Sequence, residues 1–222
     1  MTDTHAIRLA MVDNDEISYM GLASILQRAL PGYKFVWGET CGLKAISHAL
    51  DPSNGANILL VDMSLEDIPG DMVCREIRRA NETLPLLAVT SYSLNRYMQR
   101  ASDAGAQGIV SKSEIAEVCR AIMALRRGHA IAAETANEHV DFEDMRHAHR
   151  RLALAPASAL RDLSERERTA MMLYAHAYKP AEIAAMMSVS IGSVKTYLDR
   201  AQKKLNVKSR SGLTVYWWKQ GS

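Results

Sequence analysis

The chain has 222 residues, with 27 Lys or Arg and 25 Asp or Glu and a formal net charge of +2. This length suits two small domains that each bury a core of their own. No apolar run reaches the roughly eighteen residues of a membrane span, and the first residues lack the order of a secretory signal, so we expect a cytoplasmic protein with no membrane segment. The cysteines Cys41, Cys74 and Cys119 are odd in number and far apart, which argues against a disulfide framework or zinc knuckle.

The net charge hides a division along the chain. Residues 1–128 carry 13 Lys or Arg and 15 Asp or Glu, residues 129–160 carry 3 and 5, and residues 161–222 carry 11 and 5. The last segment therefore has a net charge of +6, and the two before it have −2 each. A basic surplus at one end is typical of a nucleic-acid-binding module joined to an acidic regulatory domain, although a solvated basic face gives the same sum.

The first 128 residues alternate short apolar runs with helical periods. Helical spacing is clearest at Leu43, Ile46 and Leu50 and again over 115–125. The strand candidates are the runs at 7–12, 34–37, 57–61, 86–89 and 108–110. Five strands that alternate with helices predict an α/β domain with a flavodoxin-like, five-stranded parallel sheet over residues 1–128.

The alternation of apolar runs and helical periods ends after residue 128. Residues 129–160 combine an Ala-rich stretch with a polar section, and we expect a linker that carries one helix. From Leu163 onward only helices are expected, which predicts an all-α domain over 161–222. Its first helix has Ser164 as N-cap and Glu167 three residues later, the pattern of a capping box.

Two further helices follow closely in this second domain. Pro180 suits the first turn of a helix because its missing N–H would be unpaired there in any case. After a turn of three residues, Ser190 caps a longer helix over 191–205. Two helices joined so tightly predict a helix-turn-helix.

An acid, a hydroxyl and an ammonium group stand at the ends of apolar runs in the first domain. Asp62, Thr90 and Lys112 each end such a run, and Asp13 closes the first one. Because ligands bind at the carboxyl ends of parallel strands, these side chains should converge at one rim. Phosphoryl transfer to a carboxylate needs a nucleophilic oxygen, a divalent cation and a cationic side chain, and Asp62 and Lys112 supply the first and the last.

The spacing of these residues resembles the receiver domain of bacterial response regulators over residues 5–128. The resemblance implies that Asp62 is the phosphoacceptor and that Asp13, Asn14, Thr90 and Lys112 form the pocket and its switch. It also implies a Mg²⁺ ion, held by Asp13, Asn14, Asp62 and the backbone carbonyl of Ser64.

The sequence departs from the receiver pattern at three places. Asn14 replaces the second acid of the usual pair, which removes a charge and should weaken Mg²⁺ binding; Asp15, one place later, is a candidate replacement. Glu66 stands where many receivers have Pro, and Ile109 stands where they often have an aromatic residue. The Gly that receivers have eight positions beyond the acceptor is present as Gly70.

The helix over 191–205 has a buried stripe and a polar face. The stripe consists of Val194, Leu198, Ala201 and Leu205. Lys195, Thr196 and Asp199 face away from it, and we expect the first two to approach base edges. Candidates for contacts on the DNA backbone are Ser193, Tyr197, Lys203, Lys208 and Arg210.

Residues 161–215 resemble the LuxR-type helix-turn-helix. The resemblance rests on the segments at 163–167, 180–187, 189–196 and 204–210. Together with the receiver pattern, it makes the whole chain similar to the NarL/FixJ-family response regulators. It implies a transcriptional regulator, not an enzyme, that binds double-stranded DNA, receives its phosphoryl group from a sensor histidine kinase and acts as a homodimer.

Two other function classes are compatible with features of the sequence. Asp13-Asn14-Asp15 after a strand is similar to the nucleophile motif of haloacid-dehalogenase-like phosphatases, but the further acidic pair of that class is missing and a helix-turn-helix has no role there. Asn14 and Glu66 favour a regulator of the same fold that is controlled by a ligand or by protein contact instead of phosphorylation.

Overall fold

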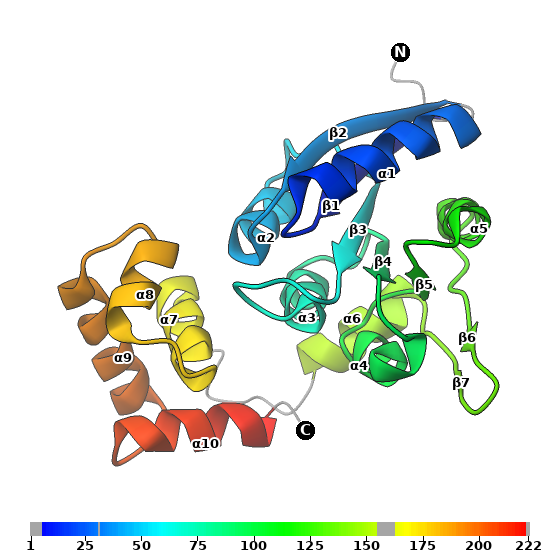
Figure 1. The fold of residues 1–222 in the computed structure, drawn as a ribbon. Coiled ribbons are helices and arrows are strands. Elements are labelled where there is room, and N and C mark those ends of the chain that lie inside the picture. The colour runs from blue at the N-terminus through cyan, green and yellow to red at the C-terminus, as the bar shows by residue number, and fades with distance from the viewer. Residues whose placement is uncertain (1–5, 31, 155–162, 221–222) are drawn as a thin grey trace. The chain divides into compact units, whose positions relative to one another are not determined.

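The computed structural model describes residues 6–30, 32–154 and 163–220 (Figure 1). The chain divides into two compact units, Met1–Ala153 and Leu154–Ser222. Within the described residues, no helix combines the length and the apolar character needed to cross a membrane.

The first unit is built on a five-stranded parallel sheet. Its strands are β1 (Ile7–Val12), β2 (Tyr33–Glu39), β3 (Ile58–Asp62), β4 (Leu86–Thr90) and β5 (Ile109–Ser111). They lie in the order β2-β1-β3-β4-β5, which confirms the flavodoxin-like topology predicted from the sequence. Every residue of β3 and β4 is buried, as expected for central parallel strands covered on both faces.

Helices cover both faces of this sheet (Figure 1). They are α1 (Glu16–Ala29), α2 (Gly42–Leu50), α3 (Gly70–Ala80), the 3₁₀ turn η1 (Leu94–Arg96), α4 (Met98–Asp103) and α5 (Ile115–Arg126). On one face α1 contacts α5, and on the other α3 contacts both α2 and α4. Residues of β1, β3, β4, α1 and α5 share one continuous apolar core, which fixes the strand ends where the polar residues stand.

Residues 129–153, where the sequence predicts the start of a linker, form part of the first unit. It contains a short antiparallel pair, β6 (Ala133–Glu134) with β7 (His139–Val140), followed by α6 (Met145–Leu154). Ala148 and Leu152 of α6 are buried. Within the described residues 129–154 of the expected linker, α6 is the one helix, and the compact unit extends to Ala153.

The second unit is entirely helical in its described residues 163–220. It consists of α7 (Glu165–Ala175), α8 (Pro180–Met186), α9 (Ile191–Lys204) and α10 (Arg210–Gln220). The predicted capping box is present, because the Glu167 N–H donates to Ser164 Oγ at 3.3 Å and the Ser164 N–H donates to Glu167 Oε2 at 2.8 Å. Ser190 caps α9 by accepting from the Ser193 N–H at 3.0 Å.

Three turns between these helices use the left-handed region without glycine. Ala177, Ser188 and Asn206 have φ of 67°, 53° and 52° and follow α7, α8 and α9. The last helix packs against its own unit: Trp217 is buried, and the Trp218 Nε1–H donates to the carbonyl of Ala175 at 3.3 Å. The aromatic tail thereby closes the helical core.

Candidate functional site

Four polar residues meet at the carboxyl ends of the strands in the first unit. Asp13 follows β1, Asp62 ends β3, Thr90 ends β4 and Lys112 follows β5. The Lys112 Nζ lies 2.6 Å from Asp13 Oδ2 and 3.1 Å from Asp62 Oδ2. Asp13, Asp62 and Thr90 are at most 4% exposed, so the structure brings these predicted residues together with Lys112 in a buried cluster, whereas Asn14 is exposed.

Backbone hydrogen bonds continue past the strand ends and hold this cluster. The Asp13 N–H donates to the Glu39 carbonyl at 3.1 Å, and the Lys112 N–H donates to the Thr90 carbonyl at 2.8 Å. The parallel register places Asp62 beside Val89 of the next strand. The positions of the side chains therefore follow from the sheet itself and not from a flexible loop.

Ser64 holds the Asp62 carboxylate through contacts that sequence reasoning missed. Its Oγ donates toward Oδ1 and Oδ2 of Asp62 at 3.1 and 3.2 Å, and its N–H donates to Oδ1 at 3.3 Å. An Asp side chain that accepts from the N–H two residues later forms an Asx turn, and a hydroxyl residue at that position offers a further donor, so this signal was available in the sequence. The resemblance to receivers implies a role only for the backbone carbonyl of Ser64.

The pocket has Asn14 where a third carboxylate would complete the acidic side of the site. The Asn14 Nδ2 donates to Glu66 Oε1 at 3.4 Å, on the exposed rim. Asp15 does not replace the missing acid, because its Oδ1 caps α1 by accepting from the Ile17 N–H at 2.9 Å. Among the described residues, no group of three or more His, Cys, Asp and Glu side chains is arranged to hold a metal ion.

An aromatic cluster lies directly after Thr90. The Thr90 Oγ1 accepts from the Tyr92 N–H at 3.0 Å, and the Tyr92 ring is 56% exposed. Tyr97 is buried, and the guanidinium carbons of Arg96 and Arg100 lie 5.3 and 5.6 Å from the centre of its ring. The aromatic residues near the hydroxyl therefore come from the segment after β4 and not from β5, which sequence reasoning did not anticipate.

In the second unit, α9 presents the polar face that the sequence predicted. Val194, Leu198, Ala201 and Leu205 are buried, whereas Lys195 and Thr196 are exposed. The Thr196 Oγ1 donates to the Gly192 carbonyl at 2.9 Å, which leaves its methyl group and oxygen lone pairs for an external contact.

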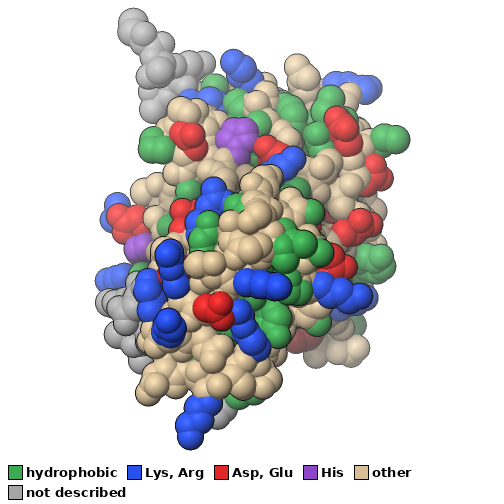
Figure 2. Space-filling view, turned by 90° about the vertical axis from the view of Figure 1, so that its left-hand side faces the viewer, with side chains coloured by type: hydrophobic (Ala, Val, Ile, Leu, Met, Phe, Trp, Pro, Cys, Tyr) green, Lys and Arg blue, Asp and Glu red, His purple; other side chains and the backbone are tan. Residues whose placement is uncertain are grey.

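The remaining nucleic-acid candidates surround this face. Asp199, Lys203 and Lys208 are exposed, while Ser193, Tyr197 and Arg210 are partly buried. Arg200, exposed beside Asp199, was missing from the predicted set. In Figure 2, which looks onto the side of the helical unit that carries α8 and α9, Lys and Arg side chains gather on the surface.

Comparison with known proteins identifies both parts of the chain. The family model of the response regulator receiver domain matches residues 9–124, and that of the luxR family of bacterial regulatory proteins matches residues 161–217. The chain belongs to the two-component response regulators. It is a receiver joined to a LuxR-type DNA-binding domain, as the sequence resemblance implied.

Several response regulators match over nearly their whole length. VraR of Staphylococcus aureus is 27% identical over 214 residues, which cover 95% of each chain. UvrY of Escherichia coli is also 27% identical, over 94% of this chain and 92% of its own.

Solved structures share the fold. RcsB from Salmonella typhimurium matches with a TM-score of 0.52 at 21% identity over 96% of this chain and 98% of its own. A LuxR-family regulator from Aurantimonas matches with a TM-score of 0.52 at 27% identity over 56% of this chain and 88% of its own. An RcsB–DNA complex matches with a TM-score of 0.52 at 20% identity, over 96% and 98%.

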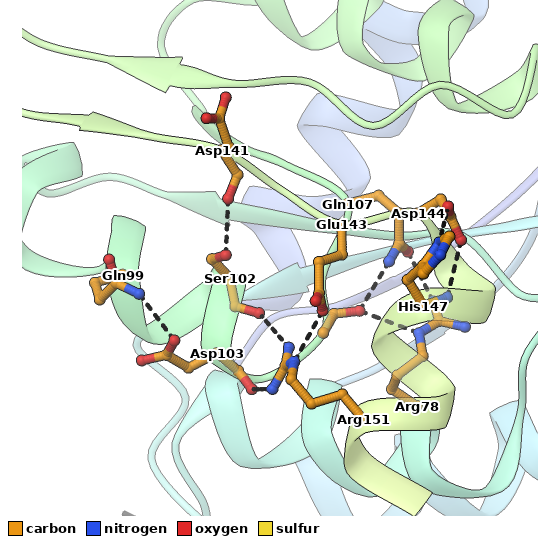
Figure 3. Close-up of polar contacts among 11 residues, drawn as sticks. Arg78, Gln99, Ser102, Asp103, Gln107, Asp141, Glu143, Asp144, His147 and Arg151 are labelled. Atoms are coloured by element: carbon orange, nitrogen blue, oxygen red, sulfur yellow. Dashed lines mark hydrogen bonds and ion pairs between the residues drawn. The ribbon is translucent and has the colours of Figure 1, made fainter.

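In this response regulator, α6 is attached to the end of α4. The Arg151 Nη1 donates to the Asp103 carbonyl at 3.0 Å and its Nη2 to the Ser102 carbonyl at 3.2 Å, while its Nε donates to Glu143 at 2.9 Å (Figure 3). The Ser102 Oγ donates to the Asp141 carbonyl at 2.9 Å. Arg151 thus satisfies carbonyls at the C-terminus of α4, where a cation is favoured.

Arg78 of α3 is buried beneath the end of α4 and binds the segments around it. It is fully buried, and its guanidinium donates to the Gly105 carbonyl at 3.1 Å and to Gln107 Oε1 at 2.7 Å (Figure 3). The same guanidinium donates to the carbonyls of Asn81 and Leu84 at 2.8 and 2.6 Å. Burial lowers the pKa of Arg78 to about 10, so it is still charged at neutral pH. The Arg78 carbonyl in turn lies 2.7 Å from His149 Nδ1 of α6.

Proposed function

We propose that this response regulator accepts a phosphoryl group on Asp62 and thereby controls its binding to promoters. The observation that carries the proposal is the contact of the Lys112 ammonium with the buried Asp62 carboxylate at 3.1 Å, at the end of β3. A carboxylate oxygen would attack the phosphorus, and the leaving group of the donor would keep the electron pair of the broken bond. Lys112 would stabilise the charge on the phosphoryl oxygens.

Mg²⁺ belongs to this proposal. Asp13, Asn14 and Asp62 and the backbone carbonyl of Ser64 offer oxygen atoms, the ligands that Mg²⁺ prefers. The ion would offset the charge that gathers when the phosphoryl group meets the carboxylates. Because the set contains two carboxylates and Asn14 is neutral, we expect weak binding.

Mass measurement tests the phosphoacceptor. The full chain is incubated with Mg²⁺ and a small acyl phosphate, and the intact mass is measured; we expect the addition of one phosphoryl group. Asp62→Asn should abolish the adduct, and Asp15→Asn, a neighbouring acid outside the cluster, should retain it. An adduct that persists in Asp62→Asn would overturn the assignment.

The DNA-binding half of the proposal rests on α9. Its exposed face carries Lys195 and Thr196 on a helix-turn-helix whose other side is buried, the arrangement by which such helices enter the major groove. The solved complex of RcsB with DNA, a protein of the same fold, supports this role. Phosphorylation should raise the affinity for duplex DNA, measured by fluorescence anisotropy with and without the acyl phosphate.

We also propose the domain boundaries of the chain, its location in the cell and its partners. We infer a receiver over 1–128, a linker over 129–160 whose helix α6 docks on the receiver, and a DNA-binding domain over 161–222. A sensor histidine kinase would donate the phosphoryl group in the cytoplasm, and a homodimer would bind paired DNA sites. The protein would act as a regulator without catalytic activity of its own.

A second mode of control is favoured by one observation. Asn14 replaces an acid and is hydrogen-bonded to Glu66, so the rim of the pocket is already bridged without a cation. A regulator controlled by a ligand or by protein contact would bind DNA equally well before and after treatment with the phosphodonor. The anisotropy experiment therefore decides between the two modes.

A further inference from the structure

Asp199 is an unusual residue for the polar face of α9. It lies four positions after Lys195, so both side chains project from the same side of the helix. The Asp199 side chain is 62% exposed, while Leu198 before it is buried. On a helix that enters the major groove, a carboxylate is repelled by phosphates, and it is tolerated only where it meets a hydrogen-bond donor or a cation.

Arg210, the first residue of α10, holds this carboxylate in place. Its Nη2 donates to Asp199 Oδ1 at 2.6 Å and to the Lys195 carbonyl at 3.1 Å. Its Nη1 is buried and has no hydrogen-bond partner among the described residues, so much of the guanidinium faces the protein. Arg210 therefore fixes the orientation of Asp199 and neutralises part of its charge, while no contact to Asp199 Oδ2 is found within the described part of the chain.

We propose that Asp199 is a specificity-determining residue that accepts a hydrogen bond from the N4 amino group of a cytosine in the major groove, and that Arg210 is its positioning residue. This inference rests on the proposed binding of duplex DNA through α9. Only cytosine N4 and adenine N6 offer donors in the major groove, and adenine places its N7 acceptor beside N6, where it repels a carboxylate. Cytosine is thus the base that Asp199 favours.

The pitch of the helix places this contact relative to Lys195. Asp199 lies one turn further along α9, about 5.4 Å, and base pairs are stacked about 3.4 Å apart. The cytosine should therefore lie one or two base pairs from the position that Lys195 contacts.

Selection from random duplexes tests the proposal with the full-length chain in the presence of Mg²⁺ and an acyl phosphate. We expect the wild-type protein to enrich sites with an invariant C·G pair, and to bind them about five- to tenfold more tightly than sites altered at that pair. Asp199→Asn should shift the preference at that pair to A·T, because the Asn amide pairs with adenine N6 and N7. Asp199→Ala should lose the preference there and retain it elsewhere.

Variants of Arg210 test the positioning role. Arg210→Ala should weaken discrimination at that base pair, and Arg210→Lys, which keeps a cation near Asp199, should restore part of it. Glu165→Gln removes one exposed carboxylate from α7 and serves as the matched charge control, with an unchanged selected site. Thermal unfolding confirms that each variant is folded.

Two outcomes overturn the proposal in different ways. If Asp199→Asn tightened binding equally on all duplexes and selected the same site, Asp199 would act only as a repulsive charge. If the wild-type protein enriched no sequence at all, the proposed DNA-binding function would itself fail, and the inference with it.

Discussion

The backbone carbonyl oxygen of Asp62 occupies the space where a side chain of Gly70 would begin. A Cβ atom built on Gly70 would lie 2.1 Å from that oxygen and 2.7 Å from the Cα atom of Met63. Both obstacles are backbone atoms, so neither can rotate away. The start of α3 is therefore pressed against the strand end that presents the acceptor, and glycine is required for this close approach.

Gly70→Ala should destabilise the receiver and distort the acceptor. We expect a loss of about 1–3 kcal/mol in the free energy of unfolding, measured with urea, because overpacking forces the backbone to shift. Phosphorylation by an acyl phosphate should slow in parallel. Gly21→Ala is the matched control: apart from its chain neighbours and the backbone of its own helix, no atom lies within 4 Å of the added Cβ, and the substitution should stabilise α1 by about 0.5–1 kcal/mol.

Asn14→Asp should tighten the binding of Mg²⁺. The substitution restores a second acid next to Asp13 and breaks the amide donation to Glu66. A charged oxygen ligand in place of a neutral one increases the affinity for a hard cation. Isothermal titration with Mg²⁺ measures the change, and an unaltered dissociation constant would remove Asn14 from the explanation of weak binding.

Lys195→Ala and Lys208→Ala should weaken DNA binding in different ways. Lys195 lies on the exposed face of α9, so its removal should cost about 1–3 kcal/mol on the preferred site and relax selectivity at one base pair. Lys208 lies beyond the end of α9, and its removal should weaken binding to all sequences and reduce the salt dependence. Anisotropy titrations on preferred and unrelated duplexes at several salt concentrations separate these results. Equal losses on both duplexes for Lys195→Ala would contradict its role at base edges.

Glu167 should make the helical unit sensitive to acid. Burial acts to raise the pKa of Glu167, but hydrogen bonds from Lys204 Nζ at 2.7 Å and from the Ser164 N–H outweigh it, and the pKa lies below its ordinary value. The folded state therefore gains stability from the ionised carboxylate above the pKa of the unfolded chain. This contribution is lost as the pH falls through the lower pKa of the folded state.

Glu167→Gln should remove this part of the pH dependence. At neutral pH it should lower the stability of the helical unit by about 1.5–3 kcal/mol, the usual contribution of a hydrogen bond to a charged group. Urea unfolding followed by tryptophan fluorescence in a Trp37→Phe background reports on this unit, because the other two tryptophans lie in α10. Glu165→Gln, exposed on the same helix, should leave the acid limb unchanged.

Ala177→Gly should stabilise the same unit. Ala177 has φ of 67° directly after α7, where a side chain is strained and glycine is not. We expect a gain of about 1 kcal/mol. The same substitution at Ala181, exposed within α8, should instead destabilise by about 0.5–1 kcal/mol. Equal effects at the two positions would show that the turn does not strain Ala177.

The positions of the polar residues at the strand ends were predictable because the apolar runs that mark the strands are visible in the local sequence. Asp62 and Thr90 each end an apolar run, and parallel strands bring the ends of such runs to one edge. The same holds for the helix caps at Ser164 and Ser190, whose pattern lies within four residues. Spacing in the sequence also predicted that Lys112 and Asp13 lie near the acceptor, but it did not predict their contacts, because the position of Lys112 between the two carboxylates depends on side-chain orientation across three strands.

Contacts between segments that are far apart in the sequence explain why the docking of α6 and the partner of Asp199 were not predicted. The docking of α6 depends on Gly105, where a Cβ atom would lie 2.9 Å from Leu152 and 2.7 Å from Arg78, a relationship that spacing in the sequence does not reveal. The pair of Arg210 with Asp199 joins two helices in the same way. Periodicity assigns each residue to a face but leaves its partner undetermined.

The docked helix α6 also sets the length of chain between the two units. While Arg78 and Arg151 hold α6, residues 129–153 belong to the first compact unit. Released as flexible chain, those residues alone would span about 25–30 Å on average and would add to the connection between the two units. In the proposed homodimer, a longer connection would lower the effective concentration of one DNA-binding domain near its twin on paired sites. The polar contacts at the end of α4 would therefore bear on avidity, although they lie within the receiver.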